Sequence, residues 1–501
     1  MNKYALLKGT LILTFAGLIT RIMGFFYKIY LSNVMTPENL GLYQLVFPVY
    51  GLMFTLYGGG IQTAISQLIA GQKYNKKSIL LKAGTLSLSI ACFLSFFLFT
   101  KSDFVAGRIL MEPKCSSALR MLSFLFPFCG ITSCIQGYYF GIKRTGIPAL
   151  SQLLEQAVRI FSVFFIALYF GKGDLHLTSE LAVLGIVLGE VGASLFCLLS
   201  FRNKIFPLPS SKERRKILSP LLKLALPLTG TKLIVSLLHS LEAILIPFML
   251  KAYGFSDVQA LATYGILTGM TMPFLLFPSA ITNAFAVLIL PTVSQAQALG
   301  CYHKIKKTSE LSIKYSLLLG FYASCIFFIF GKEFGLTFFH NKTAGEYMAI
   351  LAWLCPFLYL STTLNSILNG LGKAQVTFVN TVLSLGMRIL FLCFLVPKSG
   401  LYGYLLGLLI SQIVLTLFDY FSLYYYIPME ISAVNWMVKP ATVLLAGSFL
   451  FSKLFLFLQQ KSSIHQGLLL LFLSGSLGIC YLIFLYIFHV ITLKDFKSTL
   501  S

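Results

Sequence analysis

Charged residues are scarce in this sequence, and acids are scarcer than bases. Only 11% of the 501 residues are Asp, Glu, Lys or Arg, whereas 57% are hydrophobic and the mean hydropathy is +0.84. A soluble globular chain does not have this balance, and an integral membrane protein does. The useful count is therefore the number of membrane spans, at about 20 residues each.

Enzymatic motifs are also missing. The sequence has no GxxxxGK[ST] phosphate-binding loop, no HExxH zinc motif and no CxxC pair among its ten cysteines. ATP hydrolysis, metalloprotease chemistry, a structural zinc and a disulfide framework are therefore not indicated. The predicted extracytoplasmic loops are short, which argues against a membrane glycosyltransferase with a large outer domain. We expect a non-enzymatic membrane carrier without a bound cofactor.

The basic residues that give the chain a net charge of +23 lie in short connections between apolar runs. They do not form a soluble basic face, so nucleic acid is not the expected partner. One set of alternate connections carries the basic clusters, at residues 73–77, 143–144, 202–216 and 304–307. Cytoplasmic loops retain Lys and Arg, so we predict a multi-pass cell-membrane protein with both termini in the cytoplasm.

An internal repeat organises the apolar runs, of which there are about fourteen at the length of a span. Residues 122–146 align without a gap on residues 351–375, so that Pro127 falls on Pro356, and the same register puts Arg159 on Arg388. Repeats separated by six spans share one orientation in the membrane. The predicted fold is an all-α integral membrane protein with two six-helix bundles related by the repeat and a C-terminal helix pair. Its predicted parts are a six-helix bundle (1–201), a basic cytoplasmic linker (202–220), a second six-helix bundle (221–426), and helices 13 and 14 with a tail (427–501).

Two equivalent helices of the repeats contain residues that weaken an α-helix. The second helix holds the triplet Gly58–Gly60, and the eighth holds Pro273 and Pro278. These residues predict bending beside a cavity between the bundles, and close helix packing is the alternative reading.

Arg21 lies near the middle of the first apolar run, where a guanidinium is costly. We interpret it as a contact for an anionic substrate. The alternative is an arginine that snorkels to the interface or pairs with a structural acid.

The seventh helix concentrates other ionisable residues, with Lys232, His239 and Glu242 on roughly one face. We expect Lys232 to contact substrate and Glu242 to bind a proton or sodium ion, although a salt bridge to Arg21 or Lys232 is the alternative for Glu242. Glu155 and Arg159 are four residues apart, and this spacing predicts a structural ion pair.

Several stretches resemble one known family. They are Lys8–Ser32 (KGTLILTFAGLITRIMGFFYKIYLS), Gly41–Ala70, Leu224–Pro247 and the octapeptide LPTVSQAQ at 290–297. Together they are similar to the stage V sporulation protein B family, in the polysaccharide transporter branch of the multidrug/oligosaccharidyl-lipid/polysaccharide flippase superfamily. The resemblance implies a MATE-like fold and a flippase related to the lipid II flippases. Its expected substrate is an undecaprenyl-pyrophosphate-linked sugar used in spore cortex peptidoglycan, with cell-wall synthases as expected partners.

The resemblance also assigns roles to single residues. Arg21 matches the first-helix arginine of the family, and Lys232 stands where sporulation members tend to have arginine. The nearest polar residues to the further cavity arginines of the lipid II flippases are Gln44, Gln62 and Asn283. A sodium site like that of the lipid II flippases would use oxygen donors from helices seven and eleven, namely Glu242, Asn380 and Ser384.

Two other functions compete with the flippase. A cation-coupled multidrug antiporter of the same fold needs a buried acid and an aromatic lining, and a non-transporting scaffold for cell-wall synthesis needs neither. Arg21 and Lys232 favour an anionic cargo. Coupling to sodium or to protons stays open at this point.

Overall fold

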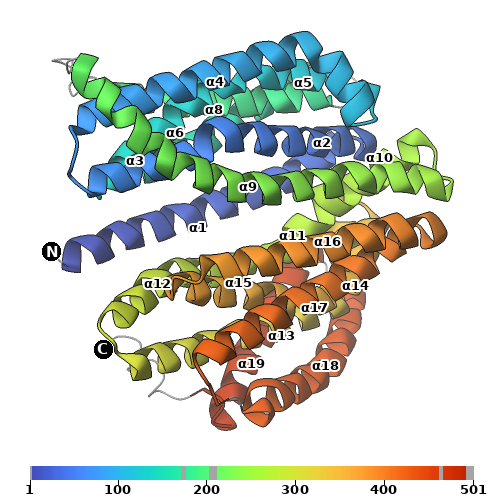
Figure 1. Cartoon of the computed structure of the whole chain (residues 1–501). Helices are drawn as coiled ribbons and strands as arrows, with labels where there is room; N and C mark the ends of the chain where they lie inside the picture. The colour runs from blue at the N-terminus through green and yellow to red at the C-terminus, as the bar shows by residue number, and fades with distance from the viewer. Residues whose placement is uncertain (1–2, 171–176, 202–210, 431, 462–465, 492–501) are drawn as a thin grey trace. The chain divides into compact units, whose positions relative to one another are not determined.

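The computed structural model describes residues 3–170, 177–201, 211–430, 432–461 and 466–491, which are helical with short connections and contain no strand (Figure 1). Thirteen of the described helices are long and apolar enough to span a membrane, or fourteen when the bent pair Pro113–Ser123 and Leu125–Gly141 counts as one span. The predicted all-α membrane fold is confirmed. The chain forms two compact units, Met1–Gly265 and Ile266–Ser501.

The described residues of the first unit form ten α-helices, two π-helical turns and one 3-10 turn. In chain order they are α1 (Lys3–Val34), α2 (Pro37–Phe54), η1 (Thr55–Gly59), α3 (Gly60–Ala70), α4 (Lys76–Phe104), η2 (Val105–Ile109), η3 (Pro113–Cys115), α5 (Ser116–Ser123), α6 (Leu125–Gly141), α7 (Gly146–Phe170), α8 (Ser179–Phe201), α9 (Ser211–Tyr253) and α10 (Asp257–Gly265). The helix pairs α7–α8, α3–α6 and α4–α6 make extensive contacts, and α4, α6 and α8 are neighbours in Figure 1.

The second unit begins with the π-helical turn η5 (Ile266–Thr271). It continues through α11 (Met272–Leu276), α12 (Ser279–Ala298), α13 (Tyr302–Phe339), α14 (Lys342–Leu351), η6 (Ala352–Leu354), α15 (Cys355–Gly370), α16 (Ala374–Ser399), α17 (Leu401–Tyr426), η7 (Val434–Val438), α18 (Lys439–Lys461) and α19 (Gln466–Ile487). Helices α16 and α17 lie side by side along their length (Figure 1).

The repeat is visible in where helices break. The fourth span bends by 47° at Phe124, three residues before Pro127. Its equivalent is interrupted by the 3-10 turn η6 at Ala352–Leu354, just before Pro356. Proline has no amide hydrogen to donate to the preceding turn, so a helix yields at that point. The two halves thus share a local irregularity as well as a sequence register.

The predicted weak points in helices two and eight also break the α-helical pattern. A π-helical turn occupies Thr55–Gly59 beside the glycine triplet, and another occupies Ile266–Thr271 just before Pro273. The eighth apolar run, near residues 260–291, is not one continuous helix, because α10, η5, α11 and α12 divide this stretch. The alternative reading, close helix packing, is confirmed at Gly60, which lets α9 approach closely: a Cβ there would lie 2.0 Å from Thr229 Oγ1. Bending beside a cavity stays a prediction.

The predicted linker at 202–220 is described only in its second half. Residues 202–210 lie outside the described ranges, and Ser211–Pro220 form the start of the long helix α9. This stretch contains two Lys, two Arg and one Glu, which are good helix formers, so helix is the physically reasonable outcome. Helix α9 packs against α2, α3 and α4, and its contacts group it with the first unit. The predicted division into bundles at 1–201 and 221–426 was drawn from the sequence repeat, and it stays a prediction.

Candidate functional site

Lys232 is held against the π-helical turn of the second span. Its Nζ donates to the carbonyl oxygen of Gly59 at 2.9 Å and to Thr63 Oγ1 at 3.4 Å. A π turn shifts backbone hydrogen bonds from the i+4 to the i+5 donor, so carbonyls at its edge accept side-chain donors readily. Further along α9, Ser240 Oγ donates to the carbonyl of Pro48 at 3.1 Å. One face of α9 is therefore attached to α2 and η1 by polar contacts.

No carboxylate of the described residues forms an ion pair with the ammonium of Lys232. The oxygens that it contacts are a carbonyl and a hydroxyl, and its side chain is exposed. It lies within the span Ile217–Tyr253. Neutral oxygens do not cancel the positive charge of the ammonium, so the charge is available to an anionic ligand.

Arg21 is exposed on α1, within the span Leu11–Val34. Among the described residues its guanidinium takes part in no ion pair or hydrogen bond. The alternative pairing of Arg21 with Glu242 is not present, and the Glu242 carboxylate instead lies 3.5 Å from His239 Nδ1. Arg21 on α1 and Lys232 on α9 are thus both cations within spans of the first unit that no described carboxylate neutralises.

The three predicted amides have different surroundings. Gln62 joins a hydrogen-bonded chain across α3, α6 and α7: it donates to Gln136 Oε1 at 3.3 Å, and Gln136 donates to Ser151 Oγ at 2.9 Å. Asn283 donates to its own helix at the carbonyl of Ser279. Gln44 is half-buried on α2. Gln62 and Asn283 are therefore engaged locally, and a substrate role for the three stays a prediction.

The predicted ion donors divide between the two units. Glu242 is buried on α9 in the first unit, whereas Asn380 and Ser384 are buried on α16 in the second. Asn380 Nδ2 donates to Asp419 Oδ1 at 2.9 Å, and Ser384 Oγ donates to the carbonyl of Ser411 at 2.8 Å. Their grouping into one ion site with Glu242 stays a prediction.

Asp419 is the residue that sequence reasoning left without a role. It is fully buried on α17, and one of its carboxylate oxygens has no hydrogen-bond partner among the described residues. The sequence does show that Asp419 is an acid within an apolar span. It does not show the contact of Asp419 with Asn380, because that contact depends on the packing of α16 on α17. A buried carboxylate beside an amide is a more complete ion site than Asn380 and Ser384 alone.

The predicted pairing of Glu155 with Arg159 is confirmed, because the Arg159 guanidinium donates to the Glu155 carboxylate. The equivalent arginine differs, since Arg388 Nε donates to Ser411 Oγ at 2.9 Å. Position 384, which corresponds to Glu155, is a serine. The two arginines that the repeat aligns therefore make different contacts.

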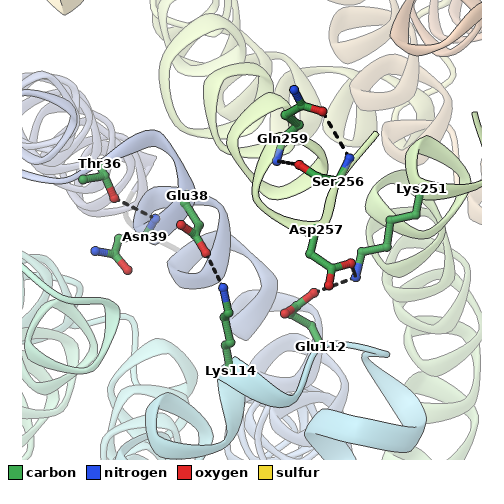
Figure 2. Close-up of polar contacts among 9 residues, drawn as sticks. All are labelled: Thr36, Glu38, Asn39, Glu112, Lys114, Lys251, Ser256, Asp257 and Gln259. Atoms are coloured by element: carbon green, nitrogen blue, oxygen red, sulfur yellow. Dashed lines mark hydrogen bonds and ion pairs between the residues drawn. The ribbon is translucent and has the colours of Figure 1, made fainter. Parts of the chain in front are cut away.

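A cluster of ion pairs lies at one end of the first unit, where α2 begins and α9 ends (Figure 2). Lys251 Nζ lies 2.9 Å from Glu112 Oε2 and 2.9 Å from Asp257 Oδ1, and Lys114 Nζ lies 2.6 Å from Glu38 Oε1. These five residues, called the ion-pair cluster below, connect α2, η3, α9 and α10. Glu112 is 4% exposed, so at least one pair is shielded from water.

Helix caps fix the backbone around the ion-pair cluster. Thr36 Oγ1 accepts from the amide of Asn39 at the start of α2, and Ser256 and Gln259 cap the start of α10 reciprocally, as Figure 2 shows. Such caps satisfy amides that have no partner within the helix. Below the caps, α2 and α10 approach so closely that a Cβ on Gly265 would lie 2.3 Å from the carbonyl oxygen of Pro37.

Comparison with known families agrees with this architecture. Residues 6–297 match the family described as polysaccharide biosynthesis protein, and residues 232–394 match the family MatE. The chain is 27% identical over 465 residues to stage V sporulation protein B of Bacillus subtilis, covering 89% of each protein. It is 25% identical to the lipid II flippase MurJ of the same organism, covering 77% of this chain and 76% of the relative.

Solved structures show the same fold at low sequence identity. The lipid II flippase MurJ in an inward closed conformation has a TM-score of 0.72 at 14% identity, covering 96% of this chain and 99% of that one. An inward-facing multidrug resistance MATE family transporter has a TM-score of 0.65 at 16% identity, covering 81% and 94%. The sporulation-family resemblance and the MATE-like fold predicted from the sequence are confirmed.

Proposed function

Because the chain belongs to the polysaccharide biosynthesis protein family, we propose that it moves a lipid-linked cell-wall or polysaccharide precursor across the cytoplasmic membrane. The cargo class is an undecaprenyl-pyrophosphate-linked sugar, and the setting is spore cortex peptidoglycan synthesis. The sporulation relative and the lipid II flippase among the similar proteins support this choice. Cell-wall synthases that make or consume the precursor are the expected partners.

The observation that carries the proposal is the pair of unneutralised cations in the first unit. Arg21 and Lys232 lie in membrane spans, are exposed and contact no described carboxylate. An exposed charge at that depth is costly unless it faces water or a charged ligand. A pyrophosphate supplies the missing negative charge, while its polyprenyl tail stays in the hydrocarbon.

The chemistry of the two cations is complementary. The guanidinium of Arg21 offers a planar fork that pairs with two phosphate oxygens, and the ammonium of Lys232 is a compact charge. The hydrogen bonds from Lys232 to Gly59 and Thr63 hold that ammonium in place before cargo arrives. Preorganisation of this kind reduces the ordering cost of binding.

Transport proceeds by alternating access in this proposal. The ion-pair cluster and the close approach of α2 to α10 close the first unit at the end where α2 begins. With both termini in the cytoplasm, this end faces outward. A proton or sodium gradient supplies the energy through the buried donors Glu242, Asn380 and Ser384, to which the structure adds Asp419.

The test is a flipping assay in proteoliposomes with an undecaprenyl-pyrophosphate-linked sugar. Arg21→Ala and Lys232→Ala are each expected to lower the rate by about tenfold or more, as for loss of a hydrogen bond to a charged group. The matched control is Lys453→Ala, because Lys453 is an exposed cation in a span of the second unit that lies over the Phe449 ring. Unchanged flipping in both variants contradicts the proposal.

A cation-coupled multidrug antiporter is the second candidate, because residues 232–394 match the MatE family and MATE structures share the fold. Ethidium transport measured in parallel in the same proteoliposomes separates the two. Ethidium movement without precursor flipping favours the antiporter, and movement of neither favours a non-transporting scaffold.

A further inference from the structure

Glu190 is a buried carboxylate that the proposed transport path does not use. It lies on α8 with only 5% of its surface exposed, and its Oε1 has no hydrogen-bond partner among the described residues. A buried carboxylate normally has its oxygens occupied by donors, because desolvation of the charge is otherwise uncompensated. Glu190 departs from this rule at a defined place in the fold.

The place is the contact between α7 and α8. A Cβ on Gly189 would lie 2.8 Å from the carbonyl oxygen of Glu155 and 3.1 Å from Arg159 Cβ, so the two helices touch there. Glu190 is therefore within electrostatic range of both Glu155 and Arg159. The site contains two carboxylates and one guanidinium.

The guanidinium is committed to the other carboxylate. Arg159 donates to Glu155 and also to Gln156 Oε1 at 3.3 Å, while its Nε has no partner among the described residues. The Glu155–Arg159 pair is neutral as a unit, so an ionised Glu190 would be a net buried negative charge. Such a charge is removed most simply by a proton.

The other titratable groups near Glu190 supply no further positive charge. From α2, η1 and α6 they are Tyr50, Tyr57 and Cys129, and Tyr27 and Tyr43 lie near Arg159. Phenols and thiols are neutral at physiological pH. Arg159 is thus the one cation facing Glu190 among the described neighbours.

The same feature recurs in the second half of the chain. The gap-free register that puts Pro127 on Pro356 and Arg159 on Arg388 also puts Glu190 on Asp419. Asp419 is 0% exposed and likewise has one carboxylate oxygen without a partner among the described residues. Asn380 on α16, which donates to its other oxygen, is neutral, and Arg388 on the same helix donates to Ser411. Among the described residues, the equivalent helices α8 and α17 thus each carry a buried acid with a carboxylate oxygen that has no partner.

We propose that Glu190 and Asp419 are a repeated pair of proton-binding sites, one in each half of the chain, that hold carboxylic acids at neutral pH. A metal ion is the weaker occupant at Glu190, because the adjacent guanidinium repels it. When Glu190 releases its proton to water on the side of the partly exposed Glu155, the carboxylate gains Arg159 as a partner through the vacant Nε–H. The guanidinium then bridges two carboxylates, and the charge of the site changes by one.

The idea that these protons drive cargo movement rests on the proposed function. The protonation of Glu190 and Asp419 does not depend on it and can be tested without cargo. Infrared difference spectroscopy of the full-length protein in lipid nanodiscs, without cargo and with pH as the variable, reads the carbonyl stretch of protonated carboxylic acids. We expect such a band at neutral pH, in sodium-free and in sodium buffer alike. Glu190→Gln and Asp419→Asn should each remove a component of it.

The matched control is Glu180→Gln, which changes an acid at the start of the same helix that already accepts from Ser117 at 2.6 Å and should leave the band intact. A spectrum of Glu190→Gln identical to that of the unmodified protein overturns the inference. If that variant does not fold, Glu155→Gln decides, because it frees Arg159 to pair with an ionised Glu190. The Glu190 component should then be lost, and its persistence overturns the inference.

The two proposals fail separately in these measurements. A protein that shows the band but flips no precursor overturns only the proposed function. A protein that flips precursor but lacks the band overturns only the inference about Glu190 and Asp419.

Discussion

At the scale of single residues, substitutions of Arg21 test substrate binding most directly. Arg21→Lys keeps the charge but loses the planar fork, so we expect flipping intermediate between the unmodified protein and Arg21→Ala. Rates in proteoliposomes, normalised to inserted protein, measure the difference. Equal rates for Arg21→Lys and Arg21→Ala would show that charge alone is not what Arg21 contributes.

A double variant separates substrate binding from a structural pairing. Arg21 and Glu242 form no ion pair in this structure, and Glu242 lies beside His239 instead. Removing both charges with Arg21→Ala and Glu242→Ala should therefore not restore transport. Recovery of flipping together with thermal stability would indicate a pair that forms in another conformation and would contradict direct contact with cargo.

Glu242 gives a second prediction at this scale. It is 6% exposed on α9, and an amide neither exchanges a proton nor binds a cation as strongly as a carboxylate. Glu242→Gln should therefore remove the dependence of transport on an imposed proton or sodium gradient while transport down the cargo's own gradient persists. Gradient dependence that survives this change assigns Glu242 a structural role.

The sequence revealed single charges better than their partners. Arg21, Lys232 and Asp419 can be found by scanning apolar runs for ionisable residues, because such positions are costly. The contact from Lys232 to Gly59 spans 173 positions and depends on a π turn that no local pattern specified. The i, i+4 pair of Glu155 and Arg159 was predictable, since its geometry is local to one helix.

At the scale of helices, the crossing of α2 and α10 depends on a small residue. Because a Cβ on Gly265 would lie 2.6 Å from the backbone nitrogen of Gly41, Gly265→Ala must push the helices apart. We expect a loss of about 1–3 kcal/mol, as for overpacking of a well-packed contact. Thermal unfolding in detergent measures it, and Gly84→Ala is the control, because a Cβ on Gly84 meets nothing within 4 Å. Equal melting temperatures for the two variants would show that the contact is not tight.

The ion-pair cluster predicts a pH dependence. The hydrogen bond and charge of Lys251 lower the pKa of Asp257, which lies outside the spans. A lowered folded-state pKa means that the stabilisation is complete above the ordinary aspartate value and is lost as pH falls through the lowered value. Asp257→Asn should therefore melt earlier than the unmodified protein at neutral pH and equally at strongly acidic pH.

The control for Asp257 is Glu346→Gln, since the Glu346 carboxylate lies 4.0 Å from Lys342 and contributes little. It should melt like the unmodified protein across the pH range. If Asp257→Asn lowers the melting temperature by the same amount at every pH, the effect comes from packing and not from the ion pair.

Helix irregularities were foreseeable only where proline or glycine marked them. The glycine triplet and Pro273 predicted breaks that the structure contains as η1 and η5. The extension of α9 back to Ser211 was not foreseen, because Pro220 and the serines suggested a linker. Proline is tolerated within a long helix when neighbouring helices support the chain, and α3 and α4 pack against this one.

At the scale of the whole molecule, orientation is the untested property on which the direction of transport depends. The basic clusters predict that the connection before α9 faces the cytoplasm. A single cysteine at Ser211 in a background without the ten native cysteines should resist an impermeant thiol reagent in intact cells and react after lysis. Labelling in intact cells would reverse the assignment of both termini and of the end closed by the ion-pair cluster.

The π-helical turn η1 has a consequence for how the chain tolerates changes in length. A π turn accommodates one residue more than an α turn, so α2 and α3 together correspond to a regular helix that carries a single insertion. A residue gained or lost elsewhere in a helix rotates everything beyond it by about 100°. Within Thr55–Gly59 the extra residue is absorbed locally, and the side chains of α3 that face Lys232 keep their direction.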